Sequence, residues 1–350
     1  MSTPLWFTRC PLPTAFSLAV HSGILARHLA AFGVAPQSLR HVADASFRLA
    51  HFTHALPDMT RQGGHIPPLW SRAAGRDVRL LGLSWTDERQ LLLVERDDIQ
   101  DVADLKGKRL ALPVRPNYPI DFWRATVLKG YHDLLATVGL SLDDVTLVEI
   151  PIDAAAFAER ASRPDLLSPP GAARQTLSSQ TREGRALLAG SVDAIYSPAH
   201  YGIALQQVLG LRVLADLTRS HPPEARINNS SLLALTVSGE FLRDHSDAVT
   251  ALLTALLEAA ELARTTREMA IRITAAESGN AEELVPDIFG EHFHQVLAPS
   301  LAPALLQALA GQNEFLHRHG FIDRVVPLEE WLAPEPLATA QSRLAEVRAA

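Results

Sequence analysis

Three side chains in the N-terminal part of the chain could carry out thiol chemistry on an anion. Cys10 is the only cysteine and stands between an apolar run and a predicted helix. A thiol near a helix N-terminus meets the positive end of the helix dipole, which favours the thiolate. His51 could act as a base or as an orienting partner for that thiol. The guanidinium of Arg61, followed by two glycines and a predicted helix start, could bind an oxyanion.

Each of these residues also has an ordinary structural interpretation. A lone cysteine is most often a small buried apolar residue. His51 could cap a strand, and Arg61 could pair with an acid such as Asp58. Taken one at a time, the structural interpretation is favoured. Taken together, a thiol, an imidazole and a guanidinium form a set that suits an anionic substrate.

Other site chemistries find little support in the sequence. His51, His54 and His65 match no common metal-ligand spacing, and a single cysteine excludes a disulfide framework or a multi-cysteine metal centre. The phosphate-binding patterns G-x-G-x-x-G and G-x-x-x-x-G-K are absent, and so is the hydrolase pattern G-x-S-x-G. We therefore expect neither a metal nor a cofactor.

Hydrophobic periodicity predicts the elements that must position these residues. It places Cys10 between a strand and a helix, His51 at the end of a strand, and Arg61 in a loop rich in Pro and Gly. Strands alternate with helices over the first two thirds, so we expect an α/β protein with largely parallel sheets. The predicted strands are Leu5–Thr8, Phe47–Phe52, Val78–Leu83, Gln90–Val94, Arg109–Pro113, Val145–Ile150, Ala194–Tyr196, Arg212–Asp216 and Ser231–Val237. The predicted helices are Thr14–Leu29, Pro67–Gly75, Phe122–Val138, Arg182–Ala189, Gly202–Leu209, Ser246–Thr265, Arg267–Ser278, Phe289–Leu297, Ala302–His319 and a tail after Pro336, with a loop or lid at 164–180.

This order of elements predicts two lobes with a ligand cleft between them. The length of 350 residues fits, at about 100–200 residues per domain. We expect residues 1–97 and 216–350 to form the lobe that carries Cys10, His51 and Arg61, and residues 98–215 to form the other. The segment Tyr196–Tyr201 follows a predicted strand and could either add aromatic and polar walls to the cleft or be a hinge loop without ligand contact. The segment Asn228–Ser231 precedes another predicted strand and could offer hydrogen bonds to a ligand.

Composition limits the classes of partner that the protein could bind. With 32 basic and 39 acidic residues the net charge is -7, and no Lys/Arg run offers a nucleic-acid surface. No apolar run reaches the roughly 18–20 residues of a membrane helix. The first residues lack the basic segment of a secretory signal. We therefore expect a cytoplasmic, monomeric protein that binds a small anionic molecule and neither nucleic acid nor membrane.

The pattern around these residues resembles the aromatic sulfinate desulfinase family of the dibenzothiophene desulfurisation pathway. The most specific matches are Arg9-Cys10-Pro11-Leu12-Pro13, His51-Phe52-Thr53 and Thr60-Arg61-x-Gly63-Gly64-x-Ile66-Pro67-Pro68-Leu69. Weaker matches extend over nearly the whole chain, at Asp104-Leu105-x-Gly107-x-Arg109, Val192-Asp193-Ala194-x-Tyr196-Ser197, Arg243–Thr250 and Trp331-x-Ala333-Pro334-Glu335.

The resemblance implies the two-lobed type II fold of periplasmic solute-binding proteins, without cofactor or metal. It implies Cys10, His51 and Arg61 as catalytic residues and Gly64 as a backbone contact of the substrate. The aromatic pocket differs from the family pattern, which leaves open a sulfinate other than the family's biphenyl one. The further substrate contacts that we predict at the altered or adjoining positions are His54, Tyr131, Ser197 and His200.

Two functions follow. The first is a desulfinase that hydrolyses the C–S bond of an organic sulfinate, aromatic in the family, and releases sulfite. Arg61 would hold the sulfinate, His51 would orient Cys10, and Cys10 would either attack sulfur or deliver a proton to carbon. The second is a cytoplasmic solute-binding protein that holds a sulfonate or sulfinate without turnover. The pairing of Cys10 with His51 favours the first function, because binding alone needs no thiol.

Overall fold

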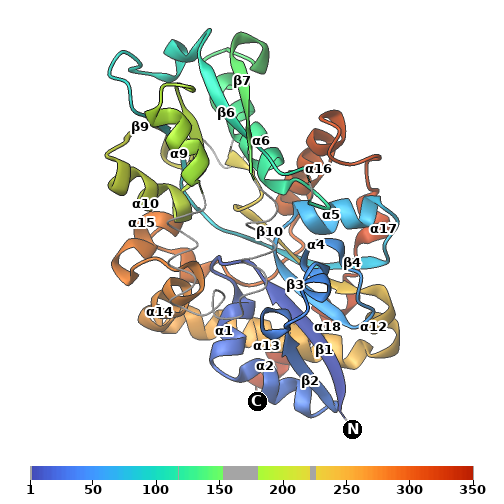
Figure 1. Cartoon of the computed structure of the whole chain (residues 1–350). Helices are drawn as coiled ribbons and strands as arrows, with labels where there is room; N and C mark the ends of the chain where they lie inside the picture. Colours follow the sequence, from blue (N-terminus) through green and yellow to red (C-terminus); the bar gives the residue numbers. More distant parts are fainter. Residues whose placement is uncertain (1, 117, 153–179, 221–225, 350) are drawn as a thin grey trace.

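The computed structural model describes residues 2–116, 118–152, 180–220 and 226–349. Within these ranges the strands form a five-stranded sheet, a three-stranded sheet and a two-stranded sheet. Figure 1 shows the five-stranded sheet in the body that also holds both chain ends, and the two-stranded sheet with α6 (Phe122–Ala136) in the other body. The predicted α/β class is confirmed.

The five-stranded sheet has the order β2-β1-β3-β10-β4. Its strands are β1 (Thr3–Arg9), β2 (Val34–Ser38), β3 (Met59–Gly64), β4 (Val78–Trp85) and β10 (Leu232–Ser238). β1 runs parallel to β2 and β3, with Thr8 opposite Arg61 and Arg9 opposite Gln62. Because the carboxyl ends of β1 and β3 meet at one edge of the sheet, Cys10 lies beside the glycines that end β3.

The sheets are mixed rather than largely parallel, so that expectation is wrong. β10 runs antiparallel to both β3 and β4. β5 (Gln90–Val94) runs antiparallel to β8 (Ile195–Pro198) and to β9 (Arg212–Asp216). Only the pair β6 (Arg109–Val114) and β7 (Thr146–Pro151), together with the β1 neighbours, is parallel among the described strands. The chain that returns as β10 enters the first sheet between two existing strands and runs against both.

Helices from the two ends of the chain cover the five-stranded sheet. The long helix α13 (Ser246–Thr265) packs against α1 (Ala15–His21), α2 (Ile24–Ala30) and α18 (Glu335–Ala349), and its buried face includes Leu252 and Leu256. The remaining helices are α3 (Ala45–Arg48), α4 (Ala50–Thr53), α5 (Ile66–Ala73), α9 (Thr181–Leu188), α10 (Ala199–Leu209), α11 (Leu217–Ser220), α12 (Gly239–Asp244), α14 (Arg267–Ser278), α15 (Val285–Phe289), α16 (Pro303–Arg318) and α17 (Leu328–Trp331). None of the described helices is long and apolar enough to cross a membrane. The division of the chain into lobes at residues 97 and 216 stays a prediction.

Two predicted helices differ from the observed ones. The single helix predicted over Thr14–Leu29 is split into α1 and α2, because Gly23 adopts a left-handed conformation with φ of 75°. The helix predicted over Phe289–Leu297 is wrong. Gly290, with φ of 92°, ends α15, and only a 3₁₀ turn follows at Phe293–Gln295.

The predictions for the chain that leads to Gly63 and Gly64 are also corrected. The strand predicted over Phe47–Phe52 is the two short helices α3 and α4, since a brief apolar run does not distinguish a strand from a buried helical turn. The predicted Pro- and Gly-rich loop contains β3, whose residues are all buried. Of the predicted loop at 164–180, all but Gln180 lies outside the described residues.

Candidate active site

Cys10 follows β1 directly and is half-buried. Its backbone N–H donates to the carbonyl of Gln62 on β3 (3.0 Å). Any side chain at Gly63 would overlap the Cβ and Sγ of Cys10, so the glycine leaves the space that the thiol fills. α1 begins only at Ala15, with Thr14 as its N-cap. The helix dipole acts within the first turn, so the charged group that faces this thiol is a side chain rather than the helix end.

That side chain is Arg61, which lies on β3 and is 1% exposed. Its Nη2 donates to Sγ of Cys10 (3.4 Å), and its Nη1 donates to the carbonyl of Gly64 (2.8 Å). Among the residues that the structure describes, its Nε has no hydrogen-bond partner. No carboxylate within the described ranges forms an ion pair with this guanidinium, so Arg61 is not the partner of Asp58 that the structural interpretation suggested. Burial lowers the pKa of Arg61, and the negative charge of a thiolate at Cys10 raises it.

A buried cation without a counter-ion is costly, and an arriving anion removes that cost. The structure thus brings Cys10, Arg61 and Gly64 together as predicted. Arg61 lies on a central strand rather than on a loop, and the pairing of β3 with β1 and β10 holds its backbone from both sides. The arrangement can bind an oxyanion next to a sulfur atom.

Arg9, the neighbour of Cys10 in sequence, points to a different cluster. Its guanidinium pairs with the buried Glu277 of α14, which also accepts from Arg40 (Nη1 to Oε2, 2.7 Å) and contacts Nε2 of His21 (2.8 Å). Burial raises the pKa of Glu277, but the hydrogen bond with His21 and the charges of Arg40 and Arg9 outweigh it, so the net shift is downward. The second Nη of Arg40 donates to the Arg9 carbonyl (3.1 Å). This cluster therefore holds the peptide that precedes Cys10.

His51 lies on α4, not at a strand end, and contacts the site through Thr8. Its Nδ1 is 2.8 Å from Oγ1 of Thr8, the residue paired with Arg61 across the sheet. No hydrogen bond between His51 and Cys10 is present in the described part of the chain. Burial lowers the pKa of His51 well below 6.5, with further lowering from Arg61, His54 and Arg40. Its imidazole is therefore neutral at neutral pH, and Thr8, which sequence reasoning did not single out, sets its orientation.

His54 is buried beside the same guanidinium. It ends α4 with φ of 50°, and its Nδ1 and Nε2 lie near the Phe52 carbonyl (3.3 Å) and Oγ1 of Thr236 (3.4 Å). Burial, followed by the charge of Arg61, lowers its pKa to about 3. His65, the third histidine of the segment, contacts the Leu232 carbonyl and Gln312, and burial lowers its pKa to about 4. The described residues include no group of three or more His, Cys, Asp or Glu side chains that could hold a metal ion.

These lowered histidine pKa values predict acid sensitivity of the fold. In the unfolded chain each histidine titrates near its ordinary pKa of 6.5, so below that pH the unfolded state binds more protons than the folded state. The free energy of unfolding should therefore fall as the pH drops from 6.5, by up to about 1.4 kcal/mol per pH unit for each such histidine. His54→Asn should make this slope shallower between pH 6.5 and 5, because asparagine tolerates positive φ and does not titrate. Denaturant unfolding at several pH values measures both slopes, and equal slopes would contradict a neutral His54.

The other three predicted contacts, Tyr131, Ser197 and His200, have hydrogen-bond partners of their own. The Tyr131 hydroxyl donates to the Ala111 carbonyl (2.8 Å), Ser197 bonds to Gln180, and His200 bonds to the buried Glu88. All three side chains are buried, and no described hydrogen bond joins them to Cys10, His51 or Arg61. Their role as substrate contacts stays a prediction.

An aromatic group connects His51 to the other body of the molecule. Phe52 stacks on Phe122 of α6 (ring centroids 5.6 Å apart, 17° between planes) and meets Tyr118 edge-on (5.7 Å). The guanidinium of Arg115 lies over Tyr118 and Phe122, at 5.2 Å from each centroid. Sequence reasoning missed this group. The sequence feature that could have indicated it is the Phe122-Trp123 pair at the start of α6.

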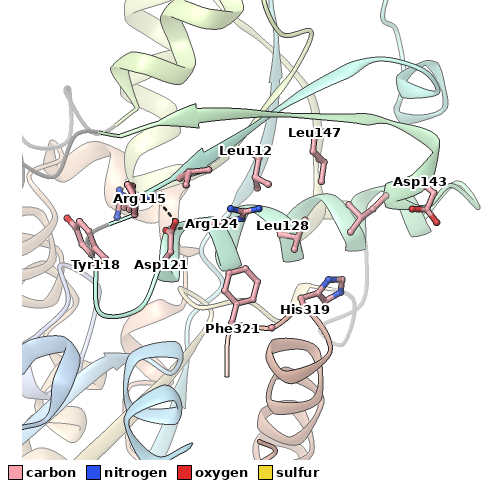
Figure 2. Close-up of a pocket in the computed structure, with 14 residues that line it drawn as sticks. Leu112, Arg115, Tyr118, Asp121, Arg124, Leu128, Asp143, Leu147, His319 and Phe321 are labelled. Carbon is pink, nitrogen blue, oxygen red and sulfur yellow. Dashed lines mark hydrogen bonds between the residues drawn. The ribbon is translucent and has the colours of Figure 1, made fainter. Parts of the chain in front are cut away.

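A hollow of about 670 Å³ lies beside this group, and Figure 2 shows Tyr118, Arg115 and Asp121 at one end of it. Leu112, Leu128 and Leu147 line it further along, and His319 and Phe321 come to it from the segment after α16. This hollow is not the predicted site, because none of Cys10, His51 and Arg61 lines it.

Known proteins resemble this chain in sequence and in fold. No family model matches the chain. The chain is 30% identical, over an alignment of 367 positions, to the 2'-hydroxybiphenyl-2-sulfinate desulfinases of Rhodococcus erythropolis and Rhodococcus qingshengii. The match covers 97% of this chain and 94% of each relative. The chain belongs to the 2'-hydroxybiphenyl-2-sulfinate desulfinase family. The family predicted from the motifs is thereby confirmed.

Solved structures agree with membership of the desulfinase family. The crystal structure of a cysteine-to-serine mutant of DSZB in complex with biphenyl-2-sulfinic acid matches with a TM-score of 0.76 and 29% identity, over 98% of this chain and 100% of that one. The periplasmic sulfonate-binding protein SsuA from Methylobacillus flagellatus KT matches with a TM-score of 0.70 and 17% identity, over 98% of this chain and 95% of that one. The predicted solute-binding-protein fold is confirmed.

Proposed function

We propose that this chain is a desulfinase that cleaves the C–S bond of an aromatic sulfinate and releases sulfite. The observation that carries the proposal is the buried guanidinium of Arg61, which has no carboxylate partner among the described residues and donates to the only thiol. Membership of the desulfinase family supports it, and so does a relative of known structure that binds biphenyl-2-sulfinic acid.

Arg61 is proposed to hold the sulfinate. The two oxygens share one negative charge, which suits the planar fork of a guanidinium through charge-assisted hydrogen bonds. Among the described residues Nε of Arg61 has no hydrogen-bond partner, whereas Nη1 is occupied by the Gly64 carbonyl. The anion would supply the counter-charge that the protein does not. Phe52 lies against His51, Tyr118 and Phe122 pack on Phe52, and these rings could receive the aromatic ring of the substrate.

Cys10 is proposed to act on the bound sulfinate with one water molecule. The balance is that RSO₂⁻ and H₂O give RH and HSO₃⁻. In one route the thiol gives its proton to the carbon as the C–S bond breaks, and water then adds to the released SO₂ and restores the thiol. In the other route the thiol loses its proton and the thiolate attacks sulfur. That proton passes to the carbon as the C–S bond breaks, and water then frees sulfite from Cys10 and restores the thiol. In both routes Arg61 stabilises the thiolate, while the neutral His51 bonds to Thr8 and would act on the thiol only through an intervening group.

The test is release of sulfite by the purified full chain. We expect sulfite from 2'-hydroxybiphenyl-2-sulfinate or from benzenesulfinate, and none from the matching sulfonates, because a sulfonate leaving group is more oxidised and cannot depart as sulfite by this reaction. Thermal stabilisation is measured with the same compounds. Stabilisation by sulfinates and sulfonates alike, without any sulfite, would overturn the enzymatic proposal and favour a solute-binding protein.

A further inference from the structure

Asn229 is placed against the proposed anion site by a glycine. It is half-exposed and lies on the segment that leads into β10. Any side chain at Gly64 would overlap its amide group, so Asn229 lies directly over that glycine. The carbonyl of the same glycine accepts from Nη1 of Arg61. The amide and the guanidinium therefore share Gly64 as a neighbour.

The orientation of the Asn229 amide is fixed by chemistry. Its Oδ1 accepts from the backbone N–H of Ile66, the first residue of α5 (3.0 Å). A backbone N–H can only donate, so the amide oxygen must face Ile66 and the NH₂ group must face away. Within the described ranges, no residue accepts a hydrogen bond from Nδ2 of Asn229.

The backbone of Asn229 is also held by a hydrogen bond. The N–H of Asn229 donates to Oδ1 of the buried Asn228 (2.8 Å). Nδ2 of Asn228 donates in turn to the Tyr196 hydroxyl and to the Thr126 carbonyl, each at 3.0 Å. Hydrogen bonds thus hold the backbone N–H and the Oδ1 of Asn229, and its Nδ2 donor is unused within the described part of the chain. Such a side chain is pre-organised for a ligand, because little conformational entropy is lost when the ligand binds.

We propose that Asn229 is a further substrate-binding residue whose Nδ2 donates to an oxygen of the sulfinate bound by Arg61. This inference rests on the proposed function. One sulfinate oxygen would face the guanidinium and the other would face the end of β3, where Gly64 and the Asn229 amide lie. The third donor adds to the charge stabilisation as the sulfinate departs.

Two substitutions separate this role from simple capping of α5. Asn229→Asp keeps the oxygen that accepts from Ile66 and replaces the donor with a second oxygen. Asn229→Ala removes both groups without adding charge. If Nδ2 binds substrate, Asn229→Asp should retain the wild-type Tm yet lose about 10²-fold in kcat/KM. Asn229→Ala should lower the Tm by a few degrees through loss of the cap, and should lower kcat/KM by about 10-fold or more.

A capping role alone predicts that Asn229→Ala loses activity only in step with its Tm. That outcome, or full activity in either variant, would overturn the inference. Should the wild-type chain bind sulfinates without releasing sulfite, the proposed function fails, and benzenesulfinate affinity from calorimetry still tests Asn229. Weaker binding in both variants supports the inference, and unchanged binding in Asn229→Ala overturns it.

Discussion

Replacing Cys10 with serine should lower the rate of sulfite release by at least about 10³-fold while leaving the protein folded. A hydroxyl is a far weaker acid and nucleophile than a thiol, so it fails in either role that the site allows. Serine is also the smaller residue, and the space beside Gly63 accepts it without strain. Binding of the sulfinate should persist, because Arg61 is unchanged.

Sulfite assay, thermal unfolding and calorimetric binding of benzenesulfinate test this result together. A cysteine-to-serine mutant of DSZB has been obtained in complex with biphenyl-2-sulfinic acid, which supports retained binding in this family. Activity of Cys10→Ser above a tenth of wild type would remove the thiol from the reaction. Loss of binding together with loss of activity would instead show that the substitution damages the site.

Replacing Arg61 with methionine should separate activity from stability. Methionine has a similar length and no charge, so the cost of burying an unpaired guanidinium disappears. The Gly64 carbonyl loses one donor, which costs about 1 kcal/mol. The net free energy of unfolding should therefore stay equal or rise. Sulfite release and sulfinate binding should fall by at least about 10³-fold, because no other cation replaces the fork.

Arg61→Lys is the matched control for that experiment. It keeps the positive charge but presents a single ammonium, which cannot contact Cys10, Gly64 and an anion in the same planar arrangement. We expect activity between those of wild type and Arg61→Met, with the loss mainly in KM. A large drop in Tm for Arg61→Met with activity retained would mean that Arg61 supports the fold rather than the substrate.

The pairing of Cys10 with Arg61 was predictable from residue type, and its structural setting was not. Glycine has low strand propensity, so the sequence around Gly63 and Gly64 was interpreted as a loop. In the structure both glycines lie on β3, where Cys10 and Asn229 occupy the space that larger side chains would fill. The close approach of other groups accounts for the composition of the strand, and no local pattern reveals those groups.

Contacts between distant segments account for the other differences. Arg9 and Glu277 are 268 residues apart in sequence, and nothing near Arg9 identifies its partner. The Tyr131 hydroxyl likewise donates to the carbonyl of the distant Ala111, and the role of Tyr131 as a substrate contact stays a prediction. Long regular helices such as α13 and α14 were predicted with the observed bounds, because their pattern is local and repeats over several turns.

The ion cluster around Glu277 has a consequence for how the protein is made. Cys10 is synthesised long before α14, which begins at Arg267. Until α14 is made, Arg9 and Arg40 lack the Glu277 carboxylate that joins them. The peptide that precedes the thiol therefore gains its full set of contacts only when a helix from the far end of the sequence docks.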